Sequence, residues 1–124
     1  MNYDNAIPIY LQVIRVIERD IVTGRLAPGD RLPSARDLAL LHGINPNTAA
    51  RVYRELEQSG VCFTRRGLGT CVTEDPDMIR ALHKEMADDI VSRFVSEIME
   101  IGMTREETIS LLEKRVESCL KAEN

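Results

Sequence analysis

The chain has 124 residues, of which 44% are hydrophobic and 29% are charged, and its formal net charge is −4. This composition is typical of a globular protein, and no run of about 18 apolar residues predicts a membrane span. The N-terminus lacks a basic segment followed by an apolar stretch, and three irregularly spaced cysteines do not predict a disulfide framework. We therefore expect a cytoplasmic protein with no membrane partner.

The first predicted element is an amphipathic helix over residues 8–23. Its apolar side chains recur at spacings of three and four, at Tyr10, Ile14, Ile17 and Ile21. Pro8 suits a first helical turn and Gly24 suits a helix end, while Pro28 and Gly29 mark a turn further on.

Two helices joined by a short glycine turn are predicted next. Ser34 can cap the first of them, in which Leu38 and Leu41 are predicted to face inward. Gly43 ends that helix, and Asn45-Pro46 begin the second at once. Such a pair is the helix-turn-helix layout.

The second helix of the pair, residues 46–59, separates into two faces at about 100° per residue. The apolar face comprises Ala49, Val52, Tyr53 and Leu56. The polar face carries Asn47, Arg51 and Arg54, with Thr48 at its border. Because amide and guanidinium groups can fork onto adenine and guanine edges, this face predicts a surface that reads the major groove.

Residues 61–73 predict a β-hairpin with a basic tip. Val61 and Phe63 form one short strand, and Thr70 and Val72 form the other. The tip comprises Arg65, Arg66, Gly67, Leu68 and Gly69. Its glycines allow a tight turn and a close approach of the backbone, so the hairpin is a candidate wing on DNA.

The distribution of charge favours a nucleic-acid partner although the total is acidic. Residues 31–66 hold six arginines against three acidic residues, whereas residues 76–124 hold seven basic and eleven acidic residues. Because arginine pairs bidentately with phosphate and guanine, the arginine-rich stretch indicates double-stranded DNA as the ligand.

Glu74 to Pro76 interrupt the pattern, and we predict two domains there, residues 1–75 and 76–124. A long helix is predicted to Ile101, with Gly102 as its end, and Thr104 and Glu107 form a capping box for a last helix. The apolar stripes of these two helices are expected to pack against each other and against a second subunit. The predicted homodimer interface comprises Ile90, Phe94, Ile98, Ile101, Leu112 and Val116.

The fold class that follows is mostly α with a small β-hairpin wing. A winged helix-turn-helix domain would precede a two-helix dimerisation segment, and two symmetric copies predict a palindromic operator.

The ordered signatures PGDRLPSARDLA, NPNTAARVYRELE and RRGLGTCV closely resemble the GntR superfamily of bacterial transcription factors over residues 7–73. The short tail resembles the YtrA-type subfamily, in which two helices mediate dimerisation and no large effector domain is present. The resemblance implies a regulator that represses transcription, in this subfamily often of its own operon, and that needs no cofactor.

The resemblance also implies roles for single residues. Arg36 and Arg54 would hold phosphates, while Asn47, Thr48 and Arg51 would enter the major groove. The wing residues that the resemblance implies at the minor groove are Arg66, Gly67 and Gly69. Some family members have arginine where this chain has Pro46 and Ala50, so their base contacts do not transfer as a set.

Several alternatives remain open at this stage. The domain could be a winged-helix module that binds protein without DNA, and the apolar stripes could line a pocket for a small-molecule effector. Cys62, Cys71 and His42 could form a redox or metal switch, although no ligand spacing typical of metal sites occurs. The glycine-rich tip lacks the lysine of a phosphate loop, and no set of catalytic residues predicts an enzyme.

Overall fold

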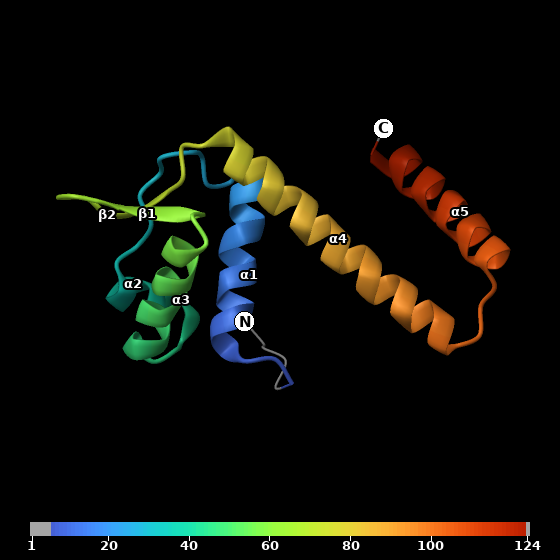
Figure 1. Ribbon diagram of the computed structural model, residues 1–124, viewed down its shortest axis with the longest axis horizontal. Coiled ribbons are helices and arrows are strands. Elements are labelled where there is room, and N and C mark those ends of the chain that lie inside the picture. The colour runs from blue at the N-terminus through green and yellow to red at the C-terminus, as the bar shows by residue number, and fades with distance from the viewer. Residues whose placement is uncertain (1–5, 124) are drawn as a thin grey trace. The chain divides into compact units, whose positions relative to one another are not determined.

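The computed structural model describes residues 6–123 and contains five helices and one hairpin within them (Figure 1). The elements in chain order are α1 (Ile9–Val22), α2 (Ala35–His42), α3 (Pro46–Gln58), β1 (Cys62–Arg65), β2 (Gly69–Val72), α4 (Pro76–Glu100) and α5 (Arg105–Glu123). The chain forms two compact units, and the boundary between them lies between Glu85 and Met86. Within the described residues, no helix is long and apolar enough to cross a membrane.

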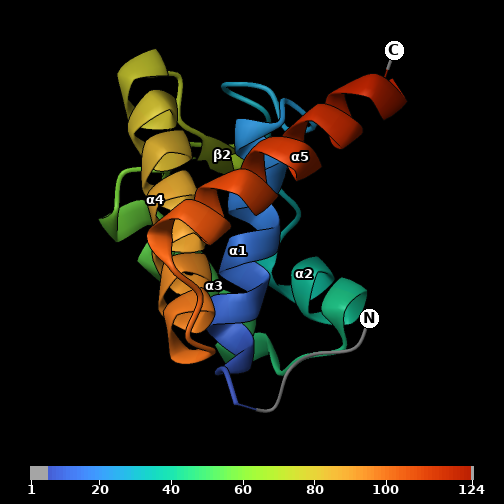
Figure 2. The ribbon, with the colours of Figure 1, turned by 90° about the vertical axis from the view of Figure 1, so that its right-hand side faces the viewer.

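The N-terminal unit is built on α1 and α3, which run side by side in both views (Figures 1 and 2). From α1, Val13, Ile17 and Ile21 are buried. From α3, the four buried residues are Ala49, Val52, Tyr53 and Leu56, as the sequence predicts. The apolar faces of the two helices therefore form a large part of the core, and the polar face of α3 stays outside it.

Local capping sets the ends of α2 and α3. The Ser34 hydroxyl accepts a hydrogen bond from the Asp37 amide at 3.1 Å, and Gly43 ends α2 at φ 63°. The Asn45 side chain accepts from the Asn47 amide at 2.8 Å, with Pro46 in the first turn of α3. The predicted helix-turn-helix is confirmed, with its turn at the predicted residues.

The inward orientation predicted for Leu41 is wrong. Leu38 and Ala39 are 2% and 4% exposed, whereas Leu41 is 70% exposed. Helix α2 has only two turns, and its buried face is centred between Leu38 and Ala39. At 100° per residue Leu41 lies about 110° from that centre.

The hairpin pairs antiparallel from Cys62↔Val72 to Arg65↔Gly69. A segment before α2 lies along the free edge of β2, which the sequence does not predict. The Leu32 amide donates to the Thr70 carbonyl at 2.8 Å, and the Val72 amide donates to the Asp30 carbonyl at 2.9 Å. The hairpin is therefore braced on one side by the segment that leads into α2.

The two buried cysteines lie on opposite faces of the hairpin. Cross-strand partners share a face, and Cys62 pairs with Val72 while Cys71 pairs with Phe63. Burial, with a smaller contribution from Glu57, raises the pKa of the Cys62 thiol to about 12, so the unreactive thiol form dominates at neutral pH. This placement does not support a disulfide between them. No cluster of three or more possible metal ligands occurs in residues 6–123.

The start of α4 belongs to the N-terminal unit. Leu82 is 5% exposed and is part of its core, and the Met78 methyl group lies against Gly60, 2.9 Å from the position that a Cβ would take there. The compact units thus divide inside α4, ten residues after the predicted boundary between residues 75 and 76.

The C-terminal unit is a helical hairpin made by the rest of α4 and by α5. Gly102 turns the chain at φ 81°. The Thr104 hydroxyl accepts from the Glu107 amide at 3.1 Å, and the Glu107 carboxylate accepts from the Thr104 amide at 3.2 Å. The predicted capping box is confirmed, and hydrogen bonding of the Glu107 carboxyl to Thr104, first to its side chain and then to its backbone, lowers the pKa of Glu107.

The C-terminal unit has no core of its own. Of the described side chains from Met86 to Ala122, none is buried. The large hydrophobic side chains exposed here are Ile90, Val91, Val95, Met99, Ile101, Ile109, Leu111, Leu112, Val116 and Leu120. A pair of helices this apolar is not stable in water without something to cover it.

Candidate nucleic-acid interface

The outer face of α3 carries the side chains predicted to read DNA. Asn47, Arg51 and Arg54 are exposed, and Thr48 is half-buried at the border of the face. Helix α3 buries its other side throughout its length, so the orientation of this face is fixed by the core. Arg36 is exposed on α2, the neighbouring helix.

Arg51 is held from two directions. Its guanidinium carbon lies 3.7 Å from the centre of the Tyr10 ring in α1, and its Nε lies 3.8 Å from Glu55 Oε1 one turn along α3. The Arg51 side chain is nevertheless 49% exposed. The ion pair with Glu55 follows from the i, i+4 spacing, whereas the ring contact joins residues far apart in sequence.

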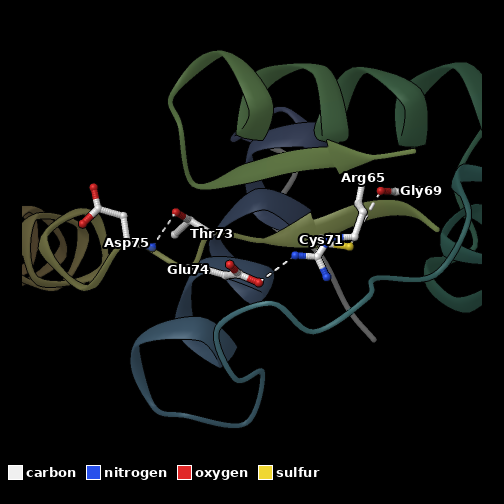
Figure 3. A network of polar contacts seen from close by, with 6 residues as sticks. All are labelled: Arg65, Gly69, Cys71, Thr73, Glu74 and Asp75. Carbon is white, nitrogen blue, oxygen red and sulfur yellow. Dashed lines mark hydrogen bonds and ion pairs between the residues drawn. The ribbon is translucent and has the colours of Figure 1, made fainter. Parts of the chain in front are cut away.

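Arg65 is the last residue of β1 and not part of the turn that follows. Its Nη2 donates to Glu74 Oε1 at 2.8 Å (Figure 3). Its guanidinium carbon lies 5.4 Å from the centre of the Phe63 ring. Figure 3 also shows the two hydrogen bonds beside this pair, from the Cys71 thiol to the Gly69 carbonyl and from the Asp75 amide to the Thr73 hydroxyl.

The tip of the hairpin is exposed, and its two glycines have left-handed backbone. Gly67 and Gly69 have φ of 84° and 93°, and no atom beyond their immediate chain neighbours lies within 4 Å of where their Cβ atoms would be. Arg66 is exposed between β1 and Gly67. The hairpin tip therefore exposes the guanidinium group of Arg66 beside the side-chain-free backbone of Gly67 and Gly69.

Glu57 joins α3 to both strands of the hairpin. Its Oε1 accepts hydrogen bonds from the Thr64 hydroxyl at 2.5 Å and from the Thr70 hydroxyl at 3.4 Å. Sequence reasoning missed this contact, because an acidic residue on an arginine-rich helix looks like a solvated charge. The contact ties the position of the hairpin to that of α3.

Tyr53 fixes α3 to the segment before α2. Its hydroxyl donates to the Pro33 carbonyl at 2.5 Å. Burial is the largest of the effects that raise the pKa of this phenol above its usual value. The helix-turn-helix and the hairpin are thus joined in one compact unit, from which the amides and guanidinium groups of α3 face outward.

Comparison with known proteins agrees with this geometry. Residues 9–72 match the family described as bacterial regulatory proteins, gntR family. A regulator called YhcF from Bacillus subtilis is 37% identical over 107 residues, which cover 86% of this chain and 88% of that protein. The transcriptional repressor YtrA from the same organism is 42% identical over 71 residues, 57% of this chain and 55% of YtrA.

A solved structure extends the similarity beyond the matched family region. A GntR family transcriptional regulator from Listeria monocytogenes superposes with a TM-score of 0.82 at 38% identity, covering 90% of this chain and 98% of that one. The chain therefore belongs to the GntR family and, like its YtrA-type relatives, is a transcriptional regulator with a winged helix-turn-helix DNA-binding domain.

Proposed function

We propose that this regulator binds a roughly palindromic operator as a homodimer and represses transcription. Its own operon is among the proposed targets, as the resemblance to the YtrA-type subfamily implies. The observation that carries the proposal is the outward face of α3, where Asn47, Arg51 and Arg54 stand exposed on a helix buried along its other side. Its proposed ligand is bacterial genomic DNA, which places its action in the cytoplasm.

The proposed contacts divide into base reading and backbone binding. Asn47, Thr48 and Arg51 would contact base edges, because these amide, hydroxyl and guanidinium groups match the hydrogen-bonding pattern of the major groove. Arg36 and Arg54 would bind phosphates, which position the protein without reading sequence. The proposed wing contacts come from Arg65, Arg66, Gly67 and Gly69.

The dimer is proposed because the C-terminal unit lacks a core. Ile90, Ile101, Leu112 and Val116 are between 41% and 74% exposed, and Phe94 and Ile98 are half-buried. A groove of about 450 Å³ between α4 and α5 is lined mainly by apolar side chains, Ile98 and Leu112 among them. A second copy would cover this surface and place two recognition helices on one operator.

No catalytic step is part of the proposal, since the family and the relatives are transcriptional regulators. The surplus of acidic residues in 76–124 suits a segment that keeps away from phosphate.

The proposal is tested by measuring binding to a labelled duplex at several salt concentrations. We expect fluorescence anisotropy to report an affinity that falls steeply as salt rises, because binding releases counterions from the phosphates. A full-length, folded chain that binds no duplex at low salt would instead support a protein-interaction module.

Arg36→Ala is expected to weaken binding to every duplex by a similar factor and to reduce the slope of log affinity against log salt by about one. The reason is that a phosphate contact carries charge but no sequence information. Arg25→Ala is the matched control, since Arg25 is exposed in the loop after α1. A loss confined to one preferred sequence would contradict the role given to Arg36.

Gly67→Val is expected to lower the free energy of unfolding by about 1–3 kcal/mol, because a β-branched residue resists the φ of 84° found here. Gly67→Asn is the control, since asparagine tolerates left-handed backbone and the space around the position is open. Arg66→Ala should leave unfolding unchanged and weaken duplex binding. Thermal unfolding and anisotropy distinguish these effects, and duplex binding that is unchanged in all three variants would exclude the wing from the interface.

A further inference from the structure

Helix α1 lies outside the helix-turn-helix, yet one of its side chains touches the reading face. Tyr10 is half-buried in the first turn of α1, and the Arg51 guanidinium carbon lies 3.7 Å from the centre of its ring. At this separation the ring and the guanidinium make a close cation–π contact.

This contact leaves the hydrogen-bonding groups of Arg51 available. A guanidinium stacked on a ring uses its flat face, whereas its five N–H donors lie in its plane. Glu55 Oε1 attracts the Nε end of the group from 3.8 Å. The two terminal nitrogens are the pair that can fork onto the O6 and N7 atoms of guanine.

The other arginines assigned to this interface on α2 and α3 are not held in this way. Among the described residues, neither the Arg36 side chain nor the Arg54 side chain makes a hydrogen bond, an ion pair or a ring contact. A mobile charge is sufficient for a phosphate, whereas bidentate reading of a base needs a fixed plane. The structure thus restrains the one arginine to which base reading is assigned.

We propose that Tyr10 is a positioning residue for Arg51, which gives α1 a part in sequence discrimination without a base contact of its own. The inference rests on the proposed function, in which Arg51 reads a base pair. The ring orders the long arginine side chain before DNA arrives, so that less conformational entropy is lost when the guanidinium meets its base.

The test compares Tyr10→Phe, Tyr10→Leu, Arg51→Ala and the Tyr10→Leu/Arg51→Ala double variant of the full chain. The probes are a duplex recovered by selection with the unaltered protein, the same duplex with single base pairs changed, and a scrambled duplex. Anisotropy gives the affinities, and circular dichroism gives the thermal midpoint of each variant.

Tyr10→Leu is expected to reduce the preference for the selected duplex by roughly two- to five-fold, the worth of an exposed cation–π contact. Its affinity for the scrambled duplex and its salt slope should not change. Tyr10→Phe, which keeps the ring, should match the unaltered protein. In the Arg51→Ala background, Tyr10→Leu should have no further effect on the preference.

Three outcomes would overturn the proposal. Tighter binding by Tyr10→Leu would mean that the ring holds Arg51 away from DNA, and an equal loss in Tyr10→Phe would mean that the hydroxyl acts directly. Additive losses with Arg51→Ala would make the two residues independent. If Tyr10→Leu unfolds, Tyr10→Met, which also lacks an aromatic ring, takes its place in the same comparison.

Failure of the proposed function gives a different pattern. In that case the unaltered protein would prefer no selected duplex, or Arg51→Ala would bind as the unaltered protein does. Either result precedes any comparison at Tyr10 and would remove the basis of this inference together with the function.

Discussion

Ile98→Asp is expected to convert the proposed dimer to a monomer and to weaken operator binding by about 100-fold or more. Ile98 lies in the groove between α4 and α5 and also in the apolar surface beside Phe94 and Ile101. A carboxylate placed there would be buried unpaired in a dimer core, which costs several kcal/mol. Two linked recognition helices bind far more tightly than one, so loss of the dimer removes that gain in affinity.

Sedimentation equilibrium and operator binding should change together in this variant. Ser96→Asp is the matched control, because it adds the same charge at an exposed position on the opposite side of α4. Circular dichroism should show that the N-terminal unit remains folded, since its core contains no residue after Leu82. An Ile98→Asp chain that still sediments as a dimer would show that the interface lies elsewhere.

Arg51→Ala is expected to weaken binding to the preferred duplex by 1–3 kcal/mol, about 5- to 150-fold, and to have a much smaller effect on a scrambled duplex. The reason is that a bidentate contact to guanine carries both affinity and sequence information. The loss should be concentrated at one base pair in each half-site.

This expectation is checked by measuring affinity for a panel of duplexes in which each base pair of the half-site is changed in turn. Arg19→Ala is the control, an exposed arginine on α1 that is not assigned to the interface. If Arg51→Ala keeps the full preference of the unaltered protein at every position, the reading face has been placed on the wrong residues.

The helices and their ends could be predicted because their signals are local. Ser34, Asn45 and Thr104 act within three residues of themselves, and each caps as predicted. The burial of α3 follows from a period that persists over 13 residues. The same reasoning failed for Leu41, because a helix of two turns offers too few positions to locate its buried face.

The apolar surface of α4 is wider than the predicted stripe. Val91, Val95 and Met99 are exposed beside the stripe that contains Ile90 and Ile98, so that apolar side chains cover about half the circumference of the helix at 100° per residue. One stripe would suffice to pack against α5, and the additional width is what a partner subunit would cover. This greater width could have been predicted, because the spacing of Val91, Val95 and Met99 is visible in the sequence.

The contacts that shape the interface could not be predicted in the same way. Tyr10 meets Arg51, and Thr64 meets Glu57, only because α1, α3 and β1 pack together. The hairpin register sets Arg65 opposite Gly69, yet its side chain pairs with Glu74, which lies beyond the other end of β2. Such pairs depend on the tertiary arrangement of elements and leave no periodic signal in the chain.

Selection of bound sites from a random duplex library by the full-length chain tests the central claim most directly. A symmetric pair of recognition helices predicts an enriched, roughly palindromic sequence whose half-site centres lie about one helical turn, or a multiple of it, apart. Sequencing that shows no enrichment over the starting library, or a single unrepeated motif without symmetry, would contradict the account.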